Sequence, residues 1–226
     1  MKIVSLLCRG KSLEHIDMLP KPDRCVLVNA FHFELNNKNV HEHVLDSPAV
    51  SHVVSLGSFF KQMIHDGVYE QYNFDEIIVP YIKEVCPGIP GYLCSIKGNN
   101  GILPVSTLSD NNKKDMVSTA RYKFTSPSCG LDALLYAIND LKSDIINIIG
   151  LDFYDNVGYL TNSYGRRLDE NTTEDVVRRM RGSDHDATHM IPFFLKVVND
   201  HPEVQFNLYT KSEIQSDNLN LKITRV

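Results

Sequence analysis

Short runs of apolar, mostly β-branched residues recur along the chain, separated by segments of helical or irregular character. The clearest run is DIINIIG at residues 144–150. Similar runs occupy residues 2–8, 24–29, 50–56, 76–79 and 204–209. Continuous apolar runs of this length are typical of strands buried on both faces, as in parallel sheets that helices cover. Periodicity and capping residues predict helices over residues 12–16, 58–65, 131–141 and 189–198. The pattern therefore predicts an α/β fold, with a mostly parallel sheet and helices on both of its faces.

The length and composition are those of one globular domain spanning residues 1–226. With a formal net charge of −5, the chain lacks the excess of cations that a general nucleic-acid binder needs to displace counterions. No stretch approaches the ~20 apolar residues of a membrane helix, and the N-terminal apolar run is too short for a signal peptide. We therefore expect a cytoplasmic protein with no nucleic-acid partner and no transmembrane segment.

The five cysteines are spread along the chain without the C-x-x-C spacing of a zinc or redox site. Two of them lie in apolar runs, where a thiol behaves as a small hydrophobe. This usage favours reduced thiols, although a bridge between Cys86 and Cys94 in an oxidising compartment stays open.

In open parallel sheets, ligands bind beyond the carboxyl ends of the strands, near a reversal of the strand order. The first such segment is Cys8-Arg9-Gly10-Lys11-Ser12. Its glycine lets the backbone approach a ligand, while the amides that open a helix and the two cations suit an anion. A tight turn with two solvated cations explains the same residues, and the local pattern alone favours that interpretation.

A second segment combines hydroxyl groups with a helix start. Ser126 and Ser128 precede Gly130 and the helix predicted over 131–141. Hydroxyls and helix-start amides suit a carboxylate or phosphate, but they also serve as ordinary helix caps. One hydroxyl can cap the helix while the other meets a ligand.

A third segment follows the clearest strand and contains Asp152 and Tyr154, with Tyr159 further on. Phenol hydroxyls can donate hydrogen bonds to a departing phosphate without being ionised. Packing of the aromatic rings is the commoner fate of such residues.

The fourth segment is Asp184-His185-Asp186. A histidine between carboxylates can act as a general base near neutral pH. The Asp-x-Asp pattern is also one that many glycosyltransferases use to hold a divalent cation, and a solvated polar loop is the plainest interpretation.

Taken in order, these segments resemble the sialyltransferases, both bacterial and Golgi-type. CRGKSLEHID and RCVLVNAFHF are similar to the first strand-loop and the second strand of that family. SPSCGLDALLYAI resembles the P-S/T-T-G sialyl motif, and DIINIIGLDFYD resembles a strand that ends in G-I-D-F-Y. DHDATHMIPFFL falls where those enzymes carry a catalytic histidine ahead of a helix. The resemblance covers about a third of the chain.

The resemblance implies a single Rossmann-like domain, a GT-A-like sialyltransferase variant, with a mobile lid at about residues 155–186. It implies inverting transfer of sialic acid from a CMP donor to a glycan hydroxyl, without a metal ion or another cofactor. His185 would be the base, and Tyr154 and Tyr159 would contact the leaving phosphate. Donor-binding positions would be Arg9, Gly10, Lys11, Ser12, Asn29, Ser55, Ser126, Ser128, Gly130 and Asp152.

Several positions depart from the family pattern and leave the donor sugar open. Arg9 replaces an asparagine, Lys11 a proline, Ser55 another asparagine and Cys129 a threonine or serine. Transfer from a different nucleotide sugar, with Asp184 and Asp186 on a metal ion, is one alternative. A non-catalytic nucleotide-binding module of the same fold is another. Acceptor identity and assembly into a homo-oligomer are not readable from the sequence.

Overall fold

A computed structural model describes residues 1–54, 63–79, 96–106, 108, 128–155, 159–160 and 187–226. The lid segment predicted at about 155–186 lies almost entirely outside these residues. Residues 58–62 of the helix predicted over 58–65, Cys86 and Cys94 also lie outside them. None of the described helices is long and apolar enough to cross a membrane.

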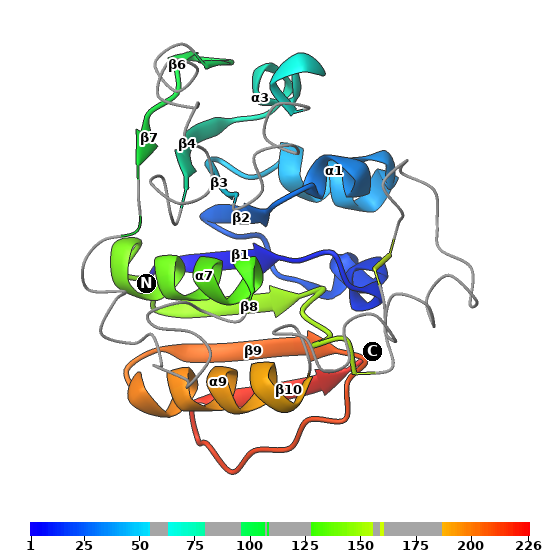
Figure 1. Ribbon diagram of the computed structural model, residues 1–226, viewed down its shortest axis with the longest axis vertical. Helices are drawn as coiled ribbons and strands as arrows, with labels where there is room; N and C mark the ends of the chain where they lie inside the picture. Colours follow the sequence, from blue (N-terminus) through cyan, green and yellow to red (C-terminus); the bar gives the residue numbers. More distant parts are fainter. Residues whose placement is uncertain (55–62, 80–95, 107, 109–127, 156–158, 161–186) are drawn as a thin grey trace.

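Eight parallel strands form the central sheet (Figure 1). They are β1 (Ile3–Leu7), β2 (Arg24–Val28), β3 (Val50–Val53), β4 (Phe74–Ile78), β7 (Val105–Ser106), β8 (Ile145–Ile149), β9 (Gln205–Thr210) and β10 (Leu221–Arg225). Their order is β10-β9-β8-β1-β2-β3-β4-β7, and every neighbouring pair is parallel. The predicted α/β fold with a mostly parallel sheet is therefore confirmed.

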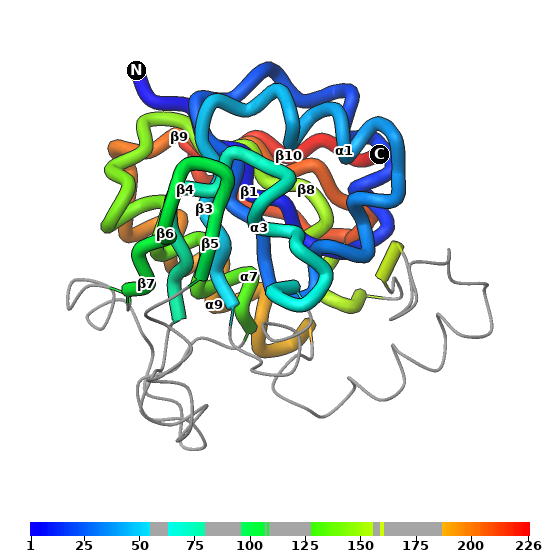
Figure 2. The backbone as a smooth tube through the Cα atoms, turned by 90° about the horizontal axis from the view of Figure 1, so that it is seen from above, coloured from blue at the N-terminus to red at the C-terminus, as the bar shows by residue number. Residues whose placement is uncertain are grey.

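Helices cover the sheet from both sides (Figure 2). One face packs against α7 (Cys129–Leu135), its π-helical continuation η3 (Tyr136–Asp140) and α9 (Ala187–Asp200). The other face packs against the 3-10 helix η1 (Lys11–Met18), α1 (Lys38–Leu45) and the short α3 (Val68–Gln71). Consecutive residues of β1 alternate between the two cores: Leu6 belongs to the first and Leu7 to the second. This two-sided burial explains why the central strands are continuously apolar.

Some elements were not expected from the sequence. The edge strand β10 alternates polar and apolar residues, and β7 has only two residues. The hairpin of β5 (Lys97–Gly98) and β6 (Gly101–Ile102) is equally short. Helix α1 is mostly polar, and its clearest signal is Asn37, whose side chain accepts hydrogen bonds from two amides of the first turn. A further 3-10 helix, η2 (Phe31–Asn36), follows β2.

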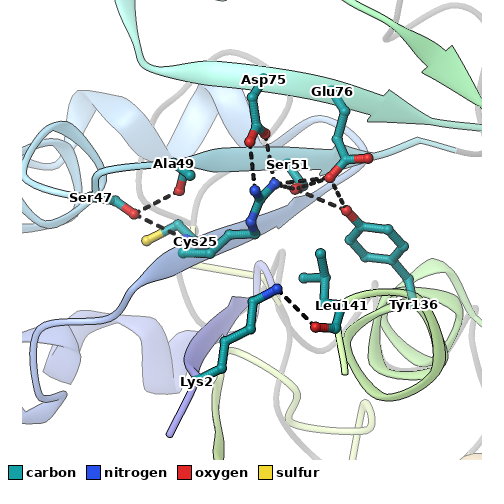
Figure 3. A network of polar contacts seen from close by, with 10 residues as sticks. Lys2, Cys25, Ser47, Ala49, Ser51, Asp75, Glu76, Tyr136 and Leu141 are labelled. Carbon is teal, nitrogen blue, oxygen red and sulfur yellow. Dashed lines mark hydrogen bonds and ion pairs between the residues drawn. The ribbon is translucent and has the colours of Figure 1, made fainter. Parts of the chain in front are cut away.

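A network of polar contacts ties β2, β3 and β4 together at the amino ends of the strands (Figure 3). Arg24 forms ion pairs with Asp75 at 2.6 Å and with Glu76 at 2.9 Å. Glu76 also accepts hydrogen bonds from Ser51 and from the hydroxyl of Tyr136 in η3. The network therefore also ties the helix that precedes β8 to the far half of the sheet.

The strand order reverses between β1 and β8. From β1 the chain builds outward through β2, β3, β4 and β7, then returns beside β1 as β8 and builds outward again through β9 and β10. The carboxyl ends of β1 and β8 therefore lie at the position where parallel α/β sheets bind their ligands.

Candidate functional site

The segments that follow β1 and β8 touch each other through their backbones. The amide of Cys8 donates to Ile149 at 2.8 Å, and the amide of Gly10 donates to Gly150 at 2.7 Å. The close contact between the two loops requires glycine at both positions, because a side chain would collide with the opposite loop. A Cβ atom on Gly150 would lie 2.1 Å from the carbonyl oxygen of Cys8, and one on Gly10 would lie 2.4 Å from Asp152. The glycine at position 10 thus makes room for the neighbouring loop of the protein itself.

Buried hydrogen bonds of Ser12 and Asp152 connect the same two loops. The amide of Ser12 donates to Oδ2 of Asp152 at 2.8 Å, and its hydroxyl accepts from the amide of Gly150 at 2.9 Å. Ser12 is fully buried and Asp152 is 3% exposed. The side chains of both predicted donor-binding residues are therefore engaged in holding the β1 loop against the β8 loop.

Asp152 also fixes the end of β9. Its Oδ1 accepts from the hydroxyl of Thr210 and from the amide of Lys211, both at 2.9 Å, and its carbonyl accepts from Ser212. One buried carboxylate therefore connects the carboxyl ends of β1, β8 and β9. Donors on all sides stabilise such a charge away from water.

Arg9 lies between two aromatic rings at this edge of the sheet. Its guanidinium carbon is 4.8 Å from the ring centre of Tyr159 and 5.4 Å from that of Phe33, within the range of cation–π attraction. Its Nε donates to the buried Glu34 at 2.9 Å. The side chain is only 10% exposed, so the cation is held in one position, and Glu34 offsets part of its charge.

Two tyrosine hydroxyls meet beside this cation. Tyr154 and Tyr159 are joined by a 2.5 Å hydrogen bond between their hydroxyls, and their rings pack edge to face. Burial, more than the neighbouring phenol, raises the pKa of Tyr154 well above its usual value. Tyr154 therefore keeps its proton at neutral pH and can act as a hydrogen-bond donor. Its backbone lies in the left-handed region at φ 54°.

The start of α7 packs against the β1 loop. Ser128 caps the helix, its hydroxyl accepting from the amide of Leu131 at 3.3 Å. A Cβ atom on Gly130 would lie 3.0 Å from Sγ of Cys8, so Gly130 allows the helix to approach that loop closely. Cys129 donates to the carbonyl of Val53 at the end of β3. Burial raises the pKa of the Cys8 thiol far above its ordinary value, so this thiol stays protonated.

Asn29 ends β2 in a left-handed conformation with φ 46°. Its amide donates to Val53 at 2.9 Å, and its carbonyl contacts Nε2 of His52 at 2.7 Å. Both partners belong to the neighbouring strand β3. Asn29 is therefore held by its backbone at the same edge of the sheet as Arg9 and Tyr154.

Of the remaining predicted site residues, the structure describes only Lys11. Lys11 is half-buried and forms no ion pair among the described residues. Ser55, Ser126 and His185 lie outside the described residues, as do Asp184 and Asp186. Within the described part of the chain, no three His, Cys, Asp or Glu side chains gather as metal ligands would.

Sequence reasoning missed the side chains that support this edge from neighbouring elements. Glu34 and Phe33 lie in η2, just past β2, and Thr210 ends β9. His52 interrupts an apolar strand with a polar ring, which is a readable signal of a buried polar contact. Its partners Asn29 and Tyr69 are 23 and 17 residues away, so no local pattern identifies them.

The structure thus brings residues 8–12 and 150–155, Tyr159, Asn29 and the start of α7 to one edge of the sheet. In comparisons with known proteins, no family model, no curated protein and no solved structure matches this chain significantly.

Proposed function

We propose that this protein is a glycosyltransferase that moves sialic acid, or a related keto-acid sugar, from a CMP donor to a glycan hydroxyl. We infer that its sheet is a Rossmann-like nucleotide-binding domain of the sialyltransferase, GT-A-like kind. The sequence resemblance supplies the reaction class. The motif segments around Gly10, Asn29, Gly130 and Asp152 come from distant parts of the chain, and their meeting where the strand order reverses supports the assignment.

The observation that carries the proposal is the hydroxyl pair of Tyr154 and Tyr159 beside the guanidinium of Arg9. A CMP donor loses its nucleotide through an oxocarbenium-like transition state, in which negative charge grows on the departing phosphate. Protonated phenols and a fixed cation stabilise such charge without transferring a proton. CMP is already a good leaving group, so no strong acid is needed.

The other residues take supporting roles in this proposal. Asn29 and Ser128 contact the donor, while Gly10, Ser12 and Asp152 keep the loops that bear Arg9 and Tyr154 in register. His185 removes the proton of the acceptor hydroxyl, a contribution of about 10²–10⁴ in rate.

The test is release of CMP from CMP-sialic acid in the presence of EDTA and a glycan acceptor. We expect release by the wild-type protein, a loss of about 10²-fold or more in His185→Ala, and a loss of about 10²-fold in Tyr159→Phe. Tyr72→Phe is the matched control, because it also removes a bonded phenol hydroxyl but from a contact with His41 in α1. Its rate should stay close to that of the wild type.

Three results would overturn the proposal. Absence of both CMP binding and CMP release in the wild type would remove the donor assignment. Release that requires a divalent cation and fails in Asp184→Asn would indicate metal-dependent transfer. CMP binding without turnover on any acceptor would indicate a non-catalytic nucleotide-binding module.

A further inference from the structure

Strand β3 holds both backbone groups of Asn29, the amide and the carbonyl. The carbonyl of Val53 accepts the amide proton of Asn29 at 2.9 Å, and the imidazole of His52 meets the carbonyl of Asn29 at 2.7 Å. Val53 and His52 are adjacent residues, so one short stretch of β3 sets both contacts.

The bonds of His52 define its protonation. A carbonyl oxygen can only accept, so Nε2 must carry the proton that it shares with Asn29. Nδ1 lies 2.6 Å from the hydroxyl of Tyr69, whose pKa burial raises well above its usual value, so that the phenol donates to the ring. His52 is fully buried, and burial lowers its pKa to about 4. The ring is therefore a neutral bridge between a donor and an acceptor.

The conformation that this bridge supports is an unfavourable one. A left-handed φ is unfavourable for a residue with a side chain, although asparagine tolerates it better than most. Tyr69 and Phe74 pack around the imidazole, with ring centres 5.7 and 6.3 Å away, so the bridge itself has little freedom. Without the bond from His52, the carbonyl of Asn29 has less to hold it in this orientation.

We propose that His52 is a positioning residue, which holds Asn29 in the left-handed conformation that its contact with the nucleotide donor requires. The nucleotide contact rests on the proposed function, whereas the hold on Asn29 does not. His52 acts through Asn29 and does not itself touch the donor. Tyr69 supports this role, because its hydroxyl keeps the imidazole in the tautomer that donates to Asn29.

The test compares the affinity for CMP among four single variants and one double variant by titration calorimetry. His52→Leu removes the donor to Asn29, and we expect CMP to bind about tenfold more weakly, the effect of one hydrogen bond. His52→Gln can still present an amide donor and an acceptor, so its affinity should return to within about threefold of the wild type. His41→Leu is the matched control, because His41 also bonds a tyrosine hydroxyl, at 2.7 Å, but contacts Tyr72. Its affinity should not change.

The fourth variant asks whether His52 works through Asn29. Asn29→Gly removes the side chain and lets the backbone adopt a left-handed φ without strain. Adding His52→Leu to Asn29→Gly should then cost no further affinity. An equal loss in both backgrounds, or unchanged affinity in His52→Leu, would overturn the proposal.

A second readout separates this inference from the proposed function. Backbone chemical shifts of Asn29 in the ligand-free protein report its φ, and the nitrogen shifts of His52 report the tautomer. We expect His52→Leu to move the Asn29 shifts out of the left-handed range and His52→Gln to retain them. If the wild type fails to bind CMP while these shifts behave as expected, the proposed function fails and His52 still positions Asn29. Asn29 shifts that do not respond to His52→Leu would overturn the positioning role.

Discussion

At the scale of single residues, Gly150 decides whether the two central loops can meet. Its φ of 76° disfavours a side chain, and its contact with the backbone of Cys8 leaves no room for one. Gly67 also has a positive φ, of 63°, but a Cβ atom there would meet nothing within 4 Å. A side chain at Gly67 would therefore strain only the backbone, whereas a side chain at Gly150 would also have no space.

Replacing each of these glycines by alanine should therefore have unequal effects. Gly67→Ala should lower the free energy of unfolding by about 1 kcal/mol, the strain of a left-handed alanine. Gly150→Ala should lower it by about 3 kcal/mol or more, because the loops must also separate. Urea denaturation of both variants measures the difference. Equal losses would mean that the contact between the loops at Cys8 and Gly150 is not tight.

The buried histidine predicts how stability depends on pH. The pKa of His52 is about 4 in the folded protein and near its ordinary 6.5 in the unfolded chain. Between these values the unfolded chain binds more protons, so stability falls as the pH falls from about 6.5 to about 4. A tenfold change in proton affinity corresponds to about 1.4 kcal/mol, which gives a loss of about 3 kcal/mol from His52.

The measurement is urea denaturation of the wild type and His52→Gln at pH 7 and pH 4. The variant has no proton to gain at this position, so its stability should fall by about 3 kcal/mol less than that of the wild type. Burial also lowers the pKa of His32 to about 4, and this contribution is common to both proteins. Parallel pH profiles would show that His52 is not buried in neutral form.

At the scale of elements, the amino ends of β2, β3 and β4 depend on the cluster around Arg24. The arginine spans from β2 across β3 to Asp75 and Glu76 on β4, and its side chain is 16% exposed. Removing it leaves two carboxylates beside each other without their cation. Ion pairs of this partly buried kind contribute more than exposed ones, since water screens them less.

We expect Arg24→Met to lower the unfolding free energy by about 2 kcal/mol, a value reduced for the partial exposure of Asp75 and Glu76. Lys196→Met is the control, because Lys196 pairs with Asp200 one turn along α9 in an exposed position. That change should cost about 0.5 kcal/mol or less. Thermal and urea denaturation compare the two, and a loss in Arg24→Met no larger than the control would exclude a structural role for the cluster.

The strands differ in how well the sequence predicts them. Strands β1, β2 and β8 were predictable because burial on both faces makes most of their residues apolar. Strand β10 was not, because it lies at an edge and exposes Lys222 and Arg225. The candidate site, too, could be predicted only in part. The two motifs that contain Ser12 and Asp152 were readable, but the hydrogen bond between these residues spans 140 residues, so the sequence could not show that they bond each other.

At the scale of the whole molecule, the sheet is most protected at its centre. Strands β1 and β8 each pair on both sides and lie between two helical layers, whereas β7 and β10 pair on one side only. Amide hydrogens in β1 and β8 should therefore exchange only through global unfolding, and those of β10 through local opening at lower free energy. Hydrogen-exchange mass spectrometry measures this order. Equal protection across the sheet would mean that it opens as one unit.

The reversal of strand order also determines when β1 can pair with β8 during synthesis. β1 leaves the ribosome first, yet Ile3 pairs with Ile145, so one edge of this strand has no partner until the ribosome has added about 140 more residues. At roughly 5–20 residues per second that interval lasts on the order of ten seconds. During it the half built from β1 to β4 carries an apolar open edge, the kind of surface on which nascent chains associate. A strand at the protected centre of the finished protein is thus an aggregation hazard during synthesis.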